Sequence, residues 1–298
     1  MYFTTVCAYP GDAAVAGGHL LREGADPTAT RFVQINQGVW GFLADVEQVV
    51  YSQILRLPRG EAKRRRCVLG RDGLYREYAA GSAPVDIPIP VAEPGYMECL
   101  CVVDDEVYAC GAQGQVFRLA GSAWKAMDRG LRLKFDGEEV KRMLLSISGF
   151  SAKDIYTCGF EGEIWHWNGS KWRELDSPTN YPLQSVLCAP DGRVYFCGSA
   201  GTLIARDTDG SWIDRGNGEL GDDTLWDLCW FRDRVHVAAD KRLLIVDSLA
   251  VREVPPPGRG AFRALSIDAS EDRLWCVGDE DVFSFDGKAW VRHVCPDN

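Results

Sequence analysis

Val107-Tyr-Ala-Cys-Gly-Ala-Gln-Gly-Gln-Val116 is the stretch that decides the fold, because the chain repeats it. It returns as Ile155-Tyr-Thr-Cys-Gly-Phe-Glu-Gly-Glu-Ile164 and as Val194-Tyr-Phe-Cys-Gly-Ser-Ala-Gly-Thr-Leu203. A weaker copy, Leu274-Trp-Cys-Val-Gly-Asp-Glu-Asp-Val282, lies near the C-terminus. Repeats at a period of roughly 40–50 residues are typical of architectures in which each unit packs on its neighbours. The repeat therefore predicts the architecture before any single residue is considered.

One repeat unit, from Leu183 to Arg215, divides into four short candidate strands. These are Leu183–Ala189, Val194–Gly198, Thr202–Arg206 and Ser211–Asp214. The first and last pairs of strands are separated by Asp191-Gly192 and Asp209-Gly210, and Asp-Gly is favoured in the tight turns of antiparallel hairpins. Four short antiparallel strands make one blade of a β-propeller.

Copies of this unit divide the chain into seven predicted blades of about 43 residues each. The predicted ranges are 2–35, 39–78, 96–128, 140–176, 183–215, 225–254 and 262–294. Residues 56–71 do not fit the pattern and are interpreted as an irregular insertion, and 80–93 as a proline-rich linker. We therefore expect an all-β fold, a single β-propeller domain over 1–298, with six or eight blades as alternatives. Blade seven would pack on blade one, with no strand exchanged between the chain ends.

The units resemble the repeats of β-propellers in the broad WD40, kelch and BNR-like group, most of all bacterial propellers with BNR-like units. The resemblance rests on the repeated phrase and on a later Asp-Gly-x-x-Trp, as in Asp286-Gly-Lys-Ala-Trp290. It is clear for 96–294 and weaker before. No blade ends in the Trp-Asp pair of WD40 repeats, and the spacer residue of sialidase-type Asp boxes is missing. The resemblance thus implies the fold and transfers no catalytic residue, since propellers host hydrolases, lyases and binding proteins.

The composition narrows the classes of partner. The 298 residues carry a formal net charge of −10, which argues against nucleic acid, because binding phosphates requires a basic face. No apolar run is long enough to span a bilayer, and the N-terminal residues do not have the features of a signal peptide. The eleven cysteines lack the spacing of a disulfide framework, which favours reduced thiols and a cytoplasmic location.

The cysteines and histidines predict packing rather than chemistry. Cys110, Cys158 and Cys197 occupy equivalent positions in successive blades, as expected of a small hydrophobic residue between sheets. Cys99-x-Cys101 has no second pair at ligand spacing, so no metal and no cofactor are predicted. Nucleophile-elbow, P-loop and His-Glu-x-x-His motifs are also missing from the sequence. We expect no catalytic residues and no enzyme activity.

The loops between second and third strands, together with the connections between blades, should lie on one face of the propeller. That face is the usual binding surface, since loops on a rigid scaffold are free to vary. The candidate binding residues there are mainly acidic or aromatic: Phe160, Glu161, Tyr181, Asp222, Asp223, Trp226, Asp240, Asp279, Glu280 and Asp281. Such a rim suits a basic protein partner with aromatic hot spots. The alternative interpretation is a solvated polar rim.

A basic segment in this acidic chain offers a second candidate surface. Its residues are Arg59, Lys63, Arg64, Arg65 and Arg66. They would form either a docking patch for an acidic partner or merely a solvated hairpin.

Three functional hypotheses follow. The leading one is a protein-binding propeller that acts as a cytoplasmic bacterial immunity protein, monomeric on its own, and neutralises a basic toxin domain. The second is a hydrolase or lyase for a sugar or small molecule, which would need a pair of carboxylates at the central channel. The third is a sensor that binds a small ligand.

Overall fold

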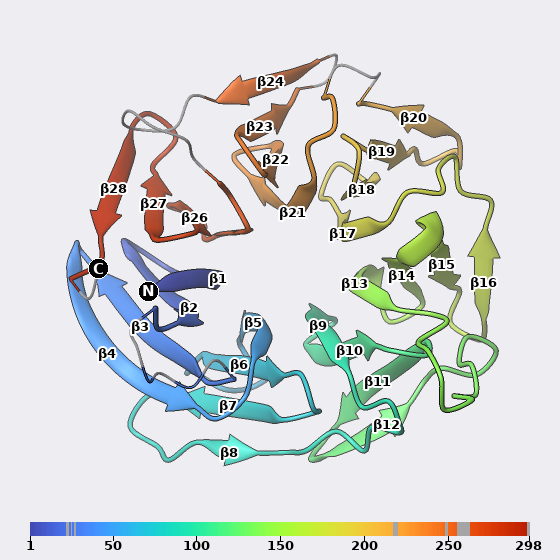
Figure 1. Cartoon of the computed structure of the whole chain (residues 1–298), viewed down its shortest axis with the longest axis horizontal. Coiled ribbons are helices and arrows are strands. Elements are labelled where there is room, and N and C mark those ends of the chain that lie inside the picture. Colours follow the sequence, from blue (N-terminus) through green and yellow to red (C-terminus); the bar gives the residue numbers. More distant parts are fainter. Residues whose placement is uncertain are drawn as a thin grey trace. The chain divides into compact units, whose positions relative to one another are not determined.

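The computed structural model describes residues 1–21, 24, 26, 28–216, 220–247, 250–254 and 263–296. The fold is all-β, with seven four-stranded antiparallel sheets arranged as a β-propeller, which confirms the predicted fold class (Figure 1). Phe262, the predicted start of blade seven, lies outside the described residues. The only helical element among the described residues is the short 3-10 helix η1 (Phe160–Gly162), and no helix there is long and apolar enough to cross a membrane.

The chain divides into two compact units. The first contains Met1–Val50 and Ala189–Asn298, and the second Tyr51–Cys188. Blade one comprises β1 (Tyr2–Tyr9), β2 (Ala13–His19), β3 (Thr30–Asn36) and β4 (Val39–Val46). Blade six comprises β21 (Leu225–Phe231), β22 (Arg234–Ala239), β23 (Leu243–Val246) and β24 (Val251–Val254). Blade seven comprises β25 (Ser266–Ala269), β26 (Leu274–Gly278), β27 (Asp281–Phe285) and β28 (Trp290–Val294).

The remaining blades follow the same strand order. Blade two comprises β5 (Val50–Arg56), β6 (Arg65–Gly70), β7 (Tyr75–Ala79) and β8 (Val85–Asp86). Blade three comprises β9 (Met97–Val103), β10 (Glu106–Gly111), β11 (Gln115–Ala120) and β12 (Ala123–Ala126). Blade four comprises β13 (Leu144–Ser151), β14 (Asp154–Gly159), β15 (Ile164–Trp167) and β16 (Trp172–Leu175). Blade five comprises β17 (Leu183–Cys188), β18 (Val194–Gly198), β19 (Leu203–Arg206) and β20 (Trp212–Asp214), close to the predicted strands.

The repeated phrase joins neighbouring blades. Its cysteine sulfur lies 3.5–3.7 Å from the carbonyl oxygen of the leucine that begins the next blade's first strand. The pairs are Cys110 with Leu144, Cys158 with Leu183, and Cys197 with Leu225. None of the eleven cysteines, all of which lie among the described residues, forms a disulfide bond. These cysteines therefore recur because each blade packs on the next, as their equivalent positions predicted.

The second glycine of the phrase allows the connection between blades to approach the turn after the second strand. Gly114, Gly162 and Gly201 all have positive φ angles, and a Cβ at any of them would collide with a backbone carbonyl of the following connection. At Gly162 the colliding atom is the carbonyl oxygen of Thr179. Glycine is required here because both the conformation and the space exclude a side chain. In these three blades the contact places the turn after the second strand beside the connection to the next blade.

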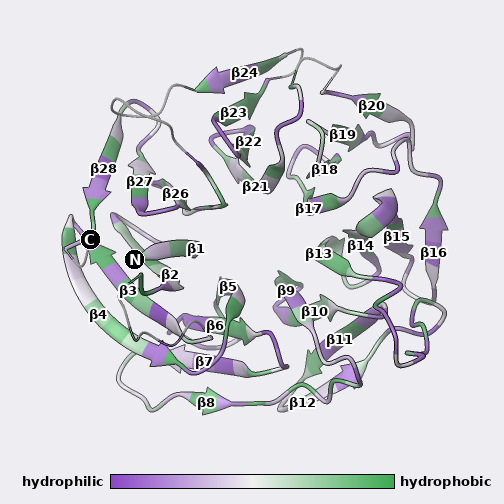
Figure 2. Ribbon diagram, viewed as in Figure 1, coloured by the Kyte–Doolittle hydropathy of each residue, from purple (hydrophilic) through white to green (hydrophobic). Residues whose placement is uncertain are grey.

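Blades one and seven pack together inside the first unit. The Phe3 amide donates to the Asp279 carbonyl at 2.7 Å, and the Ala8 amide donates to the Asp268 carboxylate at 2.8 Å. A shared core of buried residues includes Phe3 and Trp275. The β1 and β28 strands belong to separate sheets, so no strand is exchanged between the ends, as predicted. Hydrophobic and hydrophilic residues follow one another along the same strands (Figure 2), because successive side chains point to opposite faces.

The predicted division of the first two blades is wrong. Residues 39–46 do not begin blade two; they form β4, the fourth strand of blade one. Residues 56–71 are not an insertion, because they contain β6, and the supposed linker 80–93 contains β8. The sequence pattern did not predict β6 because this strand begins with two arginines instead of apolar residues. The partners of both arginines lie on β7. Arg65 pairs with Glu77, and the Arg66 guanidinium lies 4.3 Å from the centre of the Tyr78 ring.

Candidate protein-binding site

The loops of blade four bring several predicted rim residues together. Phe160 and Glu161 lie in η1, directly after β14, and Tyr181 lies in the connection from β16 to β17. Glu161 has φ 58° and ψ 22°, a left-handed conformation that shapes the turn. The close approach at Gly162 holds η1 against Thr179, two residues before Tyr181. The local backbone therefore places residues about 20 positions apart in sequence on one loop surface.

Two aromatic side chains of this surface are exposed. Phe160 is 44% and Tyr181 54% accessible to solvent. Aromatic residues that remain exposed on a folded surface are the type enriched at protein interfaces. We call Phe160, Glu161, Glu174, Asp176 and Tyr181 the blade-four rim.

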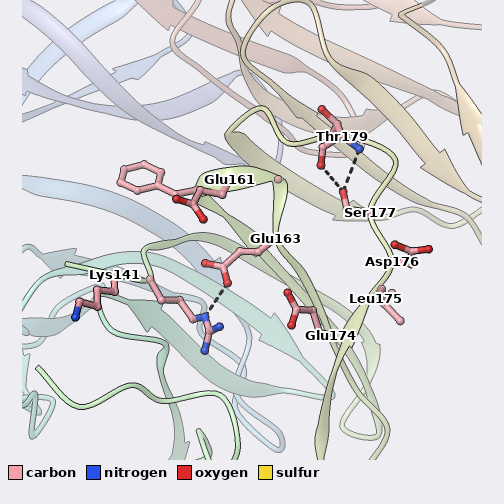
Figure 3. Close-up of a pocket in the computed structure, with 11 residues that line it drawn as sticks. Lys141, Glu161, Glu163, Glu174, Leu175, Asp176, Ser177 and Thr179 are labelled. Atoms are coloured by element: carbon pink, nitrogen blue, oxygen red, sulfur yellow. Dashed lines mark hydrogen bonds and ion pairs between the residues drawn. The ribbon is translucent and has the colours of Figure 1, made fainter. Parts of the chain in front are cut away.

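Four residues of the blade-four rim, all except Tyr181, line a pocket of about 450 Å³ (Figure 3). The two basic residues in its wall already have acidic partners. Lys141 pairs with Asp136, and Arg142 donates from Nε to Glu163 Oε2 at 2.7 Å. Burial raises the pKa of Glu163, despite its hydrogen bonds from Trp165 and Arg142. Because the opposite charges of Arg142 and Glu163 cancel in their ion pair, this part of the wall carries little net charge.

The other carboxylates of the pocket give it a net negative charge. Glu161, Glu174 and Asp176 are exposed, and none is in an ion pair with any residue that the structure describes. Figure 3 shows Glu161, Glu163 and Glu174 around the same hollow. The blade-four rim therefore combines uncompensated carboxylates with exposed aromatic rings. Both groups can interact favourably with a lysine or arginine of a partner.

Glu174 is a rim residue that the sequence reasoning missed. It lies on β16, two residues after Trp172 of the repeated fourth-strand motif, with no distinguishing signal except its exposed position in that strand. Its neighbourhood with Glu163 depends on the pairing of β15 and β16, where Trp165 lies opposite Glu174.

The predicted acidic residues of blade six, unlike those of the blade-four rim, are mostly paired with basic side chains. The side chain of Asp223 is only 3% exposed and lies 2.9 Å from Lys241 Nζ and 2.8 Å from Arg242. Burial alone would raise the pKa of Asp223, but these two bases hold it below its usual value. Asp222 beside it is exposed. Asp223 is therefore an internal support of the loop rather than an open acidic group.

Asp240 is also engaged. It accepts hydrogen bonds from Trp226 Nε1 at 2.8 Å and from Arg263 Nε at 3.2 Å. Burial opposes its ionisation, but the Trp226, Thr224 and Arg263 contacts keep its pKa below the usual value. These contacts hold the Trp226 ring near the Arg263 guanidinium, 5.8 Å from the ring centre.

The remaining predicted acids belong to blade seven. Asp279 lies 4.0 Å from Arg263, and Asp281, which begins β27, pairs with Arg292 of β28 at 2.6 Å. Glu280 is exposed between them. Basic partners therefore neutralise much of the acidic rim predicted for blades six and seven.

The predicted basic patch is only partly exposed. Arg59, Lys63 and Arg64 are exposed, but Arg66 is buried with 3% of its surface accessible, so it is unavailable for docking. Arg65 is held by Glu61 and by the buried Glu77. The reason is that β6 needs these two arginines for contacts inside blade two.

Carboxylates on the first strands of blades six and seven join adjacent blades. Asp227 Oδ2 accepts from the Ile267 amide at 3.0 Å, and Asp268 Oδ2 accepts from the Ala8 amide at 2.8 Å. Burial raises the pKa of Asp268 to about 7. Ser52, Ser146 and Ser148 make the equivalent contact elsewhere. Asp227 and Asp268 are therefore explained as structural links between neighbouring blades.

Comparison with known proteins supplies both a relative and the fold. No protein-family model matches the chain. A protein named Immune protein Tsi7, from Pseudomonas aeruginosa, is 35% identical over 199 residues. That match covers 66% of this chain and 64% of the relative, so the chain spans less than two thirds of the relative's length.

Solved structures of β-propellers resemble this chain, as its repeats predicted. The WD40 propeller domain of Doa1 matches with a TM-score of 0.70 and 11% identity, covering 95% of this chain and 91% of that one. Virginiamycin B lyase from Staphylococcus aureus has a TM-score of 0.68 and 12% identity, covering 95% and 89%. YCF48 bound to D1 peptide has a TM-score of 0.66 and 13% identity, covering 99% and 92%. At these identities the likeness establishes the fold alone.

Proposed function

We propose that this chain is a bacterial immunity protein that binds a toxin protein and neutralises it without catalysing a reaction. The observation that carries the proposal is the 35% identity over 199 residues with Immune protein Tsi7. A propeller fits this role because its rigid blades present variable loops to a partner.

We place the contact with the toxin at the blade-four rim. The exposed rings of Phe160 and Tyr181 supply aromatic anchors, and Glu161, Glu174 and Asp176 supply negative charge without a described basic partner. A basic surface around a toxin's active site would complement this rim. Binding there would exclude the toxin's substrate by steric blockage.

The remaining parts of the proposal concern the cellular compartment and the oligomeric state of the protein. Eleven cysteines without a disulfide bond favour a reducing compartment, so we propose that the chain acts in the cytoplasm. We also propose that it is a monomer before it meets the toxin, and that residues 1–298 act as one domain.

The proposal is tested by recovering the partner. The tagged full chain is purified from its native host, and co-purifying proteins are identified by mass spectrometry. We expect one stoichiometric partner that inhibits growth when expressed alone and becomes harmless when this chain is expressed with it. If the host expresses its toxin genes and no such partner is recovered, the result would count against the proposed immunity function.

The site is tested with Phe160→Ala and Tyr181→Ala. Loss of an aromatic hot spot typically costs about 2 kcal/mol, which corresponds to roughly 30-fold in Kd. The matched control is Phe42→Ala on β4, because Phe42 is 62% exposed and lies outside the rim. Equal Kd values for wild type and both rim variants would place the contact elsewhere.

A further inference from the structure

A second pocket in the first unit has chemistry that toxin binding does not explain. It lies between blades six and seven and has a volume of about 330 Å³. Its walls come from the β21–β22 turn, from β24 and from the β27–β28 turn. Pockets of this size are typical of small-molecule sites.

The floor of this pocket is a continuous group of rings. Phe231 and Phe285 meet edge to face with ring centres 6.3 Å apart, and Phe285 stacks on Trp290 at 4.8 Å. His236 adds a fourth ring, 5.8 Å from Phe231, and is only 4% exposed. Burial lowers the pKa of His236 to about 4, so its ring is neutral at physiological pH. Phe231 is only 2% exposed and lies under the Arg232 guanidinium, so the partly exposed rings of Phe285 and Trp290 supply the accessible apolar surface of the floor.

The lip of the pocket is strongly basic. Arg232, Arg234, Arg252 and Lys288 line it and are exposed. Arg252 lies 3.8 Å from Asp247, whereas the other three are in no ion pair with a described carboxylate. Glu253, the acidic residue of the lining, pairs with Arg242 at 3.7 Å. A lip on which three of four basic side chains have no described acidic partner is unexpected in a chain whose net charge is −10.

We propose that this pocket binds a small aromatic anion, with its ring on Phe285 and Trp290 of the floor and its phosphate or carboxylate group on the arginines of the lip. Planar guanidinium groups match both anions in geometry, and aromatic floors favour planar ligands by stacking. The recessed volume between two blades suits a small molecule better than an extended acidic peptide. This site is independent of the proposed toxin contact.

The test uses the intact chain and isothermal titration calorimetry with adenosine monophosphate, adenosine and inorganic phosphate. We expect the nucleotide, which has both ring and anion, to bind more tightly than either part alone. Anilinonaphthalene sulfonate, followed by fluorescence, serves as a second aromatic anion. The double variant Arg234→Ala, Arg252→Ala should weaken binding of the aromatic anions by about tenfold or more, since hydrogen bonds to charged groups are lost. Arg59→Ala, an exposed arginine outside the pocket, is the matched control.

Two results would overturn the proposal. One is the absence of binding by both aromatic anions, including the case in which only an oligoglutamate peptide binds, which would assign the basic lip to an acidic protein segment. The other is aromatic-anion binding that the double variant leaves unchanged. Toxin binding by the double variant should stay normal, so failure here is distinguishable from failure of the immunity proposal.

Discussion

Blades four and six both carry an acidic residue in the loop after the second strand, Glu161 in one and Asp240 in the other, yet the contacts of these residues differ. In blade six, Asp223 and Asp240 contact Lys241, Arg242 and Arg263. In blade four, Glu161 and its neighbours Glu174 and Asp176 are exposed without a described basic partner. The same residue types therefore support a loop in one blade and remain available to a partner in the other. The presence or absence of a basic partner therefore identifies the proposed binding surface better than the number of acidic residues does.

Replacing Glu77, the buried carboxylate that pairs with two arginines, should have the largest effect on stability. The side chain of Glu77 is 2% exposed and accepts from Arg56 and Arg65 at 2.5 Å and from Tyr75 at 2.6 Å. Glu77→Ala leaves Arg56, whose side chain is only 12% exposed, without its partner, so we expect a loss of about 3–5 kcal/mol in the free energy of unfolding. Urea denaturation measures it. The control Asp86→Ala removes an exposed pair and should cost less than about 1 kcal/mol; similar losses for both variants would refute the distinction.

Asp223 should show the next largest effect. Asp223→Ala leaves Arg242, whose side chain is 26% exposed, without its buried partner, and we expect a loss of about 2 kcal/mol in unfolding free energy. Toxin affinity should stay the same, because the residue supports its own loop. Asp222→Ala is the matched control and should change neither quantity. A strong loss of affinity in Asp223→Ala without loss of stability would move the binding surface to blade six.

The contribution of Asp268 to stability should depend on pH. Burial raises its pKa to about 7, so the folded state prefers the protonated carboxyl. Its contribution to stability is therefore complete below the ordinary pKa of aspartate and is lost as pH rises toward about 7. Asp268→Asn should flatten this part of the Tm profile between pH 4 and 8, while its amide oxygen still accepts from Ala8. An unchanged difference between variant and wild type at all pH values would contradict this account.

The smallest effect on stability should come from the unpaired carboxylates. The triple variant Glu161→Gln, Glu174→Gln, Asp176→Asn should change Tm by no more than about 2 °C, since exposed groups without partners contribute little. Differential scanning calorimetry measures it. A large drop in Tm would reveal a structural role for these side chains and weaken their assignment to a binding surface.

The repeat predicted the seven blades because its cysteine and glycine positions encode contacts between neighbouring blades. Blades one and two were divided wrongly, since Arg65 and Arg66 interrupt the apolar pattern of β6 and find their partners only after β7 pairs with it. Phe160 and Tyr181 could be selected from the sequence because loops stand out from a uniform repeat. The partners of Asp223 and Asp240 could not, because Arg263 is 23 residues from Asp240 and meets it only when two blades pack.

The central claim is that the blade-four rim binds the toxin, and charge reversal tests it most directly. The Kd of the purified complex is measured for Glu161→Lys, Glu174→Lys, Asp176→Lys together, and for Asp222→Lys on blade six. We predict at least about 30-fold weaker binding for the triple variant, and near wild-type binding for Asp222→Lys. Wild-type affinity of the triple variant, with the loss in Asp222→Lys instead, would contradict the account.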